Sequence, residues 1–199
     1  ASVLSQRFKV EKTLKNQNNE IGVPLTLLRA EHDTEILLVE MGIRKPGDMA
    51  YLTKIVRPDY AIITNIGLSH VEFFKNSKSI AVEKAKVFQP LLQWEYKKRY
   101  AFINYSSSCA DFLCTKAKKY DYQVLPFEGQ NKPDENINLC YKVGRHFGLT
   151  DMEIQEGIKE YKPIENRLQT IKTKKVTLIN DTYNSNPDGV KYALEYLKR

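Results

Sequence analysis

The sequence has no apolar run long enough to cross a membrane, and its first residues lack the charged, apolar and small-residue order of a signal peptide. It contains only 3 cysteines in 199 residues, Cys109, Cys114 and Cys140. Their odd number and their spacing match no zinc pattern. The sequence therefore predicts reduced thiols in a cytoplasmic protein that does not span a membrane.

Internal repeats and low-complexity segments are also absent. Hydrophobic residues make up 42% of the chain and charged residues 28%, a balance typical of globular proteins. The formal net charge is +7, which favours an acidic partner such as a nucleotide or a nucleic acid but says nothing about the fold.

Continuous apolar runs alternate with helical spacings along most of the chain. Strands are expected at 34–41, 60–66, 100–105 and 122–127, the first two buried on both faces. Helices are expected at 23–30, 47–56, 77–94, 109–120 and 135–147, and a last one begins at a capping box of Thr150 and Glu153. Residues 1–10 have the spacing of the end of a helix. This alternation predicts an α/β fold with a mostly parallel sheet flanked by helices.

The pattern changes after Pro163. Residues 167–173 and 175–181 have the composition of two neighbouring strands. Asn186 then caps a helix that has Pro187 at its first position. A domain boundary is therefore expected near 163–168.

Three of the expected strands end on polar groups: Glu40 after 37–39, the loop from Asn65 to His70 after 61–64, and Asp181 after 177–180. Ligands of open parallel sheets bind beyond the carboxyl ends of the strands. Glu40 follows four apolar residues, and its burial is costly unless it meets a cation or a hydrogen-bond donor. The alternative is that such an acid only caps the next helix. A single histidine after a strand, such as His70, is more often structural than a metal ligand. The spacing of Lys84 favours a solvated lysine.

A basic stretch at 93–105 interleaves cations with aromatic residues. Such a pattern can bind nucleic acid. It is more often the end of a helix entering a strand, with the aromatic rings buried, and that alternative is favoured here. The residues concerned are Trp94, Tyr96, Lys97, Lys98, Arg99 and Tyr100.

Six motifs in one order resemble the Mur ligases. They are NQNNEIGVPLTLL (16–28), VEMGIRKPGDM (39–49), ITNIGLSHVEFF (63–74), SIAVEKAKVF (79–88), ENRLQ (165–169) and NDTYNSNPDGV (180–190). Within that family they are most similar to the member that adds D-alanyl-D-alanine to UDP-N-acetylmuramoyl-tripeptide. The resemblance implies the P-loop-type central domain of the family over 1–166 and the beginning of a Rossmann-like C-terminal domain over 167–199.

The resemblance also implies a chemistry. ATP phosphorylates the carboxylate of the tripeptide, and the amine of the dipeptide attacks the acyl phosphate. By the family's pattern Glu40 and His70 hold Mg²⁺, and Lys84 becomes a carbamate that serves as a further metal ligand. The nucleotide contacts fall on Asn65, Arg167, Asp181, Asn184 and Asn186, and the contacts with the UDP-sugar-peptide fall on Asn18 and Asn19.

The chain departs from the family at several points. The ATP-binding loop G-x-x-x-x-G-K-[ST] occurs nowhere in it, and Lys15, Lys86 and Asn180 stand where a glycine, an acid and an aspartate are usual. We therefore expect a fragment or a degenerate relative that needs N- and C-terminal segments for activity. The alternatives are a non-catalytic binding or scaffolding module, an amide ligase for another amino acid, and a basic nucleic-acid-binding domain.

Overall fold

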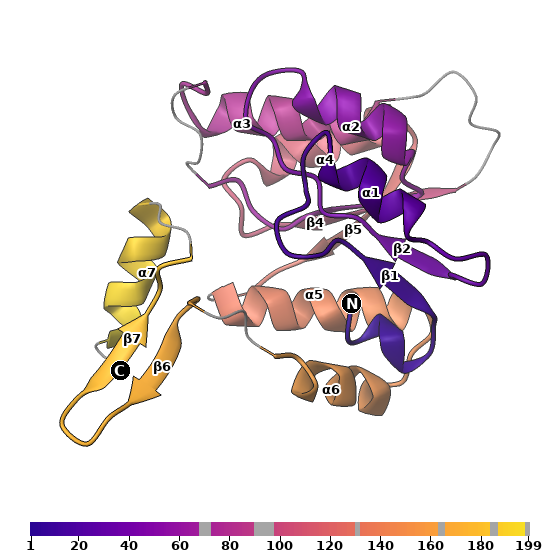
Figure 1. Ribbon diagram of the computed structural model, residues 1–199. Helices are drawn as coiled ribbons and strands as arrows, with labels where there is room; N and C mark the ends of the chain where they lie inside the picture. The colour runs from indigo at the N-terminus through magenta and orange to yellow at the C-terminus, as the bar shows by residue number, and fades with distance from the viewer. Residues whose placement is uncertain (68–72, 90–97, 130–131, 163–165, 184–186, 198–199) are drawn as a thin grey trace.

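The computed structural model describes residues 1–67, 73–89, 98–129, 132–162, 166–183 and 187–197 (Figure 1). Strands form a middle layer, with helices α1 to α4 on one side and α5 and α6 on the other (Figure 1). The predicted α/β class, with parallel strands flanked by helices, is confirmed. None of the described helices is both long and apolar enough to cross a membrane.

The parallel strands fall into two separate groups. β1 (Val10–Lys12) pairs with β2 (Ile36–Leu38), with Val10 opposite Ile36. β3 (Tyr60–Ile63), β4 (Arg99–Asn104) and β5 (Tyr122–Phe127) form a second sheet in the order β3-β4-β5. Among the described strands β2 pairs only with β1, and β3 pairs only with β4. Each group therefore has an open edge.

Helices pack on both faces of these strands. One face carries α1 (Gly22–Leu28), α2 (Asp48–Val56), α3 (Ser77–Lys84) with a 3-10 turn η2 (Ala85–Phe88), and α4 (Ala110–Lys119). The other face carries α5 (Lys132–His146) and α6 (Asp151–Lys159). A large apolar core lies on the first face and includes Ile63, Ile80 and Leu113. A smaller core, centred on Phe102 and Val143, lies under α5.

Several expected boundaries were wrong. The chain begins with a 3-10 turn η1 (Leu4–Gln6) and β1, where the sequence predicted the end of a helix. The helix expected over 77–94 is α-helical only to Lys84 and continues as the 3-10 turn η2, which ends at Phe88 because Gln89 precedes a proline and takes an extended conformation (φ −60°, ψ 136°). Residues 90–97 lie outside the described part. β3 is not buried on both faces, since Tyr60 and Ile62 are 38% and 37% exposed.

The capping box of α6 is confirmed. The Thr150 backbone N–H donates to the Glu153 carboxylate at 2.7 Å, and the Glu153 N–H donates to the Thr150 hydroxyl at 3.3 Å. The backbone and hydroxyl of Thr150, followed by Arg7, lower the pKa of Glu153 to about 2. These bonds satisfy orphan donors of the first turn and fix where the helix begins.

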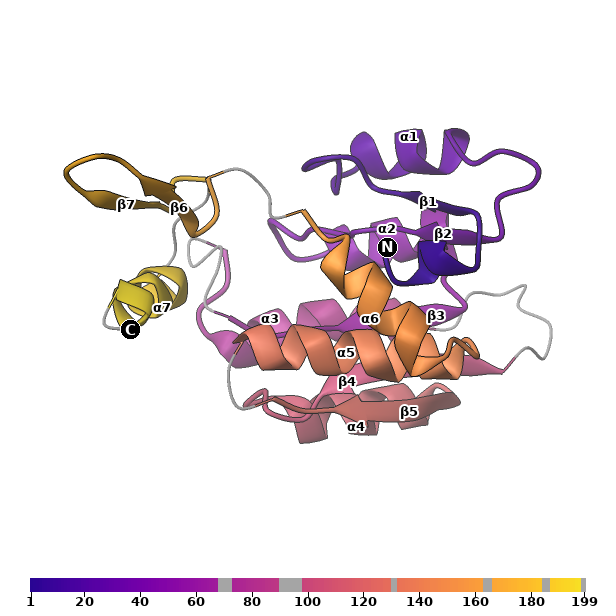
Figure 2. The same cartoon turned by 90° about the horizontal axis from the view of Figure 1, so that it is seen from below.

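The last elements form a unit that lies apart from the rest in both ribbon views (Figures 1 and 2). β6 (Gln169–Lys172) and β7 (Thr177–Asn180) are neighbours, as predicted, and the structure pairs them antiparallel; α7 (Pro187–Leu197) follows them. The expected cap Asn186 lies outside the described residues.

Candidate functional site

A cavity of about 1570 Å³ opens between β2 and β3. Near the carboxyl ends of these strands its lining includes Thr13, Asn18, Glu40, Gly42 and Lys84. Residues far apart in the sequence therefore meet where an open parallel sheet places its ligands.

Glu40 follows β2 and is held by two neighbours on the loop after β1. Its backbone N–H donates to the Thr13 hydroxyl at 2.9 Å, and its carboxylate Oε1 accepts from Asn18 Nδ2 at 2.7 Å. The Asn18 carbonyl accepts from the Gly42 N–H at 2.7 Å, and a Cβ at Gly42 would lie 3.0 Å from Asn18 Cγ. Glu40 is exposed, so its oriented carboxylate faces solvent in the cavity.

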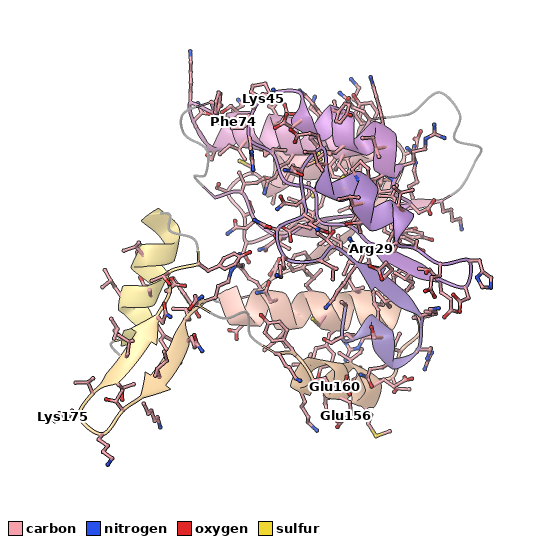
Figure 3. All side chains as sticks on the ribbon, in the orientation of Figure 1. Arg29, Lys45, Phe74, Glu156, Glu160 and Lys175 are labelled. Atoms are coloured by element: carbon pink, nitrogen blue, oxygen red, sulfur yellow. The ribbon has the colours of Figure 1, made fainter. Side chains whose placement is uncertain are left out.

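The loop that carries Asn18 is shaped by its own backbone and by α1. Lys15 has φ 50°, in the left-handed region that favours the glycine usual in the family. Asn19 Oδ1 accepts from the Gly22 N–H at 2.9 Å and so helps to start α1. Arg29, labelled in Figure 3, follows α1 and donates to Gln17 Oε1 at 2.9 Å, so it ties the loop to this helix.

Lys84 lies in the last turn of α3 and is half-buried. Its Nζ donates to the Asn65 carbonyl at 3.0 Å, and burial lowers the pKa of the amine. The Asn65 side chain accepts from the Ile66 N–H at 2.8 Å. Lys84 is therefore tied to the end of β3, in contrast to the solvated lysine that its spacing favoured.

Glu83 is a buried carboxylate beside Lys84, and the sequence analysis missed its contacts with residues that line the cavity. Only 2% of the residue is exposed, and its Oε1 accepts from the N–H groups of Gly47 at 2.9 Å and Met49 at 3.1 Å. Its Oε2 lies 2.5 Å from Lys86 Nζ. The signal was available, because Glu83 falls three residues after the buried Ile80 on the apolar side of α3. Since Glu83 binds the start of α2, Glu40 is not needed there as a cap.

The C-terminal unit carries two further candidates. The Arg167 guanidinium lies 4.6 Å above the Tyr183 ring, and Asp181 Oδ1 accepts from the Leu168 N–H at 3.1 Å. Neither Arg167 nor Asp181 lines the cavity. The structure thus brings Glu40, Lys84, Asn18 and Asn19 to one cavity and places Asn65 beside it. The predicted site residues His70, Asn184 and Asn186 lie outside the described residues.

The donor set fits a divalent metal in part. Within the described ranges no three His, Cys, Asp or Glu residues lie together in a group that could hold a metal ion. Glu40 supplies one carboxylate of the kind that Mg²⁺ prefers. Lys84 in its ordinary form supplies a cation, so it joins such a set only if it is modified.

The described part of the basic stretch, from residue 98 on, packs into the fold at Arg99 and Tyr100. Arg99 is half-buried, donates to the Tyr120 carbonyl at 2.7 Å and lies 4.7 Å from the centre of the Tyr122 ring. Tyr100 stacks on Tyr60 with 5.4 Å between ring centres. Residues 93–97 of the stretch lie outside the described part.

Comparison with known proteins decides the family. The family model of the Mur ligase middle domain matches residues 1–175. The chain belongs to the Mur ligase family. Among curated relatives, this Mur ligase chain is 29% identical to the UDP-N-acetylmuramoyl-tripeptide--D-alanyl-D-alanine ligase of Bacillus subtilis, over 98% of the chain and 48% of the relative. The enzyme of the same name from Treponema pallidum is 30% identical, over 97% of the chain and 47% of the relative.

Solved structures agree with this assignment. A crystal structure of MurF from Acinetobacter baumannii superposes with a TM-score of 0.89 at 22% identity, over 99% of this chain and 50% of that one. The Thermotoga maritima MurF ligase in complex with ADP gives 0.77 at 25% identity, over 100% of this chain and 52% of that one. The Mur ligase chain described here spans about half the length of the curated relatives that it matches.

Proposed function

We propose that this chain is the central part of an ATP-dependent ligase that adds D-alanyl-D-alanine to UDP-N-acetylmuramoyl-tripeptide in the cytoplasm. The observation that carries the proposal is the shared cavity, in which Glu40 is held by Asn18 and Thr13 while Lys84 is tied to the end of β3. The names of the relatives support the choice of substrates.

The reaction brings two anions together, the phosphates of ATP and the carboxylate of the tripeptide. Bound Mg²⁺ supplies positive charge that offsets this repulsion and stabilises the transferred phosphoryl group. Glu40 would hold the metal with its pre-oriented carboxylate, and His70 would add a second contact. Asn18, which is already bonded to Glu40, would face the UDP-sugar-peptide together with Asn19.

Lys84 would contribute as a carbamate. Burial lowers its pKa and so favours the neutral amine, whose lone pair can attack CO₂. An N–C bond forms, one proton is released, and the side chain changes from a cation to an anion with oxygen donors. This change would complete the donor set that Glu40 begins.

The C-terminal unit would take part by moving. We assign residues 1–166 to the central domain and 167–199 to the beginning of a C-terminal domain. Arg167 and Asp181, together with Asn184 and Asn186, would reach the nucleotide when the second domain closes over the cavity. Closure would also exclude water, which hydrolyses an acyl phosphate. Asn65 would contact the nucleotide from the end of β3.

The test is phosphate release from ATP, with each substrate left out in turn. The 199-residue chain alone is expected to release none, because it lacks the phosphate-binding loop. A fusion in which the unmatched N- and C-terminal segments of the Bacillus subtilis relative are placed before Ala1 and after Arg199 is expected to need Mg²⁺, UDP-N-acetylmuramoyl-tripeptide and D-alanyl-D-alanine together. In that fusion Glu40→Gln and Lys84→Met should each lower the rate at least ~100-fold. Glu156→Gln, on the exposed surface of α6, should leave it unchanged.

Two results would reject the proposal. A folded fusion that binds the UDP-peptide without any dependence on ATP would support the scaffolding alternative. Binding of nucleic acid that weakens steeply with salt would support the basic-domain alternative. The carbamate has its own readout: ¹³CO₂ should give a carbamate carbon signal in NMR spectra of the unmodified chain, and the signal should be absent from Lys84→Arg.

A further inference from the structure

Two exposed cations lie on the loop that joins β2 to α2. Arg44 and Lys45, called the cation pair below, both line the cavity, as does Glu40 earlier in the same loop. Within the described part of the chain, neither side chain of the pair forms an ion pair with an acidic residue. The proposed reaction has so far given these two charges no role.

The backbone that carries the cation pair is held in place on both sides. Before it, the Gly42 N–H donates to the Asn18 carbonyl at 2.7 Å, and Ile43, 6% exposed, is part of the large core. After it, the Gly47 N–H donates to Glu83 Oε1 at 2.9 Å. A fixed backbone reduces the entropy that is lost when the two side chains bind a ligand.

The acids next to the cation pair are engaged by other donors. Asp48 Oδ2 accepts from the backbone N–H groups of both members of the pair, at 2.8 and 2.9 Å. Glu83 accepts from two backbone N–H groups and pairs with Lys86, and Glu40 accepts from Asn18. The charge of the two side chains is therefore available to an anionic ligand.

The chemistry of the pair and its position favour a carboxylate of the peptide substrate. A guanidinium binds a carboxylate through two parallel hydrogen bonds, and a neighbouring ammonium adds a point charge. The loop is bonded at its start to Asn18, which the proposed function assigns to the peptide substrate. Lys84 and Asn65, assigned to the metal and the nucleotide, are bonded to each other at the end of β3. The cation pair therefore belongs to the peptide side of the cavity.

The distance from the reacting group also fits. Four residues separate Arg44 from Glu40, so their Cα atoms are at most ~14 Å apart. The side chains of both residues, together with the side chain of a substrate residue, span such a distance. A substrate residue whose own carboxylate reacts near Glu40 can thus place a second carboxylate at the cation pair.

We propose that the cation pair is a carboxylate-binding subsite that selects the peptide substrate. It binds a second, unreacting carboxylate on the terminal residue of the tripeptide. The chain then prefers a tripeptide whose third residue carries this additional carboxylate over one whose third residue lacks it. The inference rests on the proposed function and adds to it the class of peptide that the site accepts.

Two UDP-N-acetylmuramoyl-tripeptides that differ by one group are the probes. Their third residue is 2,6-diaminopimelate in one and lysine in the other, which is the same side chain without the second carboxylate. The protein is the fusion with the Bacillus subtilis segments, and calorimetric titration with Mg²⁺ but without ATP measures binding. The diaminopimelate form should bind at least ~tenfold more tightly at low salt. This ratio should fall as salt rises, because exposed charges are screened.

Removal of the cation pair should abolish the preference. Arg44→Gln combined with Lys45→Gln should weaken binding of the diaminopimelate form at least ~tenfold and keep binding of the lysine form within ~twofold, which also verifies that the variant folds. Arg44→Lys keeps the charge but loses the planar fork, so it should weaken the diaminopimelate form ~threefold. Lys54→Gln, on the exposed surface of α2 and outside the lining of the cavity, should change neither.

Turnover separates selection from catalysis. In the double variant the KM of the diaminopimelate substrate should rise at least ~tenfold, while kcat and the KM of ATP stay within ~twofold, since the pair binds no reacting group. A rise in the KM of ATP would mean that the pair binds phosphate. Equal binding of the two tripeptides by the unmodified fusion would mean that the site does not recognise the second carboxylate. Either result overturns the inference.

Failure of the ligase proposal gives a different result. A folded fusion that binds neither tripeptide rejects the proposed function and this inference with it. Phosphate release that needs the tripeptide but does not distinguish its two forms rejects the subsite alone.

Discussion

Glu83 illustrates how a single residue links the site to the fold. Its carboxylate accepts from two backbone N–H groups at the start of α2 and forms an ion pair with Lys86, and its side chain is only 3% exposed. Glu83→Gln keeps the size but replaces one oxygen with an NH₂ group, which cannot accept from Lys86 or from a backbone N–H. We expect the free energy of unfolding in urea to fall by about 1–3 kcal/mol.

Glu156 offers a matched control. It also pairs with a lysine three residues later, Lys159, but its side chain is 53% exposed. Glu156→Gln should change the free energy of unfolding by less than ~0.5 kcal/mol, because exposed pairs contribute little. Equal losses in the two variants would show that the burial of Glu83 is irrelevant to its contribution.

At the same scale, the sequence predicted some residues of the site and not others. Glu40 stood out because an acid after an apolar run must find a donor, and Asn18 Nδ2 provides it. Lys84 was recognised only through its resemblance to a family motif, since its spacing indicated a solvated side chain. Thr13 could not be predicted, because its hydroxyl meets Glu40 only through the pairing of β1 with β2.

Individual elements were predictable where local chemistry fixes them. The capping box starts α6 regardless of its neighbours, and the proline after Gln89 ends the preceding helix, although that signal was overlooked. β1 was missed because Glu11 and Lys12 give it no apolar pattern, and it is a strand only because β2 lies beside it. β3 was expected to be buried on both faces, and it lacks the neighbour that would cover Tyr60 and Ile62.

The contact of α6 with the first residues gives a prediction at the scale of elements. A Cβ on Gly157 would lie 2.4 Å from Val3 Cα and 2.9 Å from the Ser2 carbonyl oxygen, and both are backbone atoms that cannot rotate away. Gly157→Ala should therefore lower the free energy of unfolding by about 1–3 kcal/mol, even though alanine favours helix by ~1 kcal/mol. Urea unfolding of the variant and the unmodified chain measures this difference in free energy.

Gln155→Ala is the matched control for that substitution, because Gln155 is exposed on the same helix. Its effect should stay within ~0.5 kcal/mol or be slightly stabilising. If Gly157→Ala were as stable as Gln155→Ala, the close approach of α6 to η1 would not exist in solution.

At the scale of the whole molecule, the apolar cores all lie in the first part of the chain. The described core clusters begin at Val3, and their last members are Ile154 and the partly buried Ile158. Within the described residues after Tyr161 no side chain is buried. The hairpin of β6 and β7 with α7 therefore contributes little to the stability of the rest.

A chain shortened to residues 1–162 should accordingly keep its melting temperature within ~2 °C, because every core contact remains. Far-UV circular dichroism should lose only the signal of α7 and the hairpin.

Removal of residues 1–7 is the contrasting variant. It takes away Val3 and Leu4, each 5% exposed, and should lower the free energy of unfolding by about 1.5–3 kcal/mol for each buried side chain. Its melting temperature should fall by at least ~5 °C. A comparable fall in the 1–162 chain would mean that the C-terminal unit packs on the cores, and the boundary at 166–167 would be wrong.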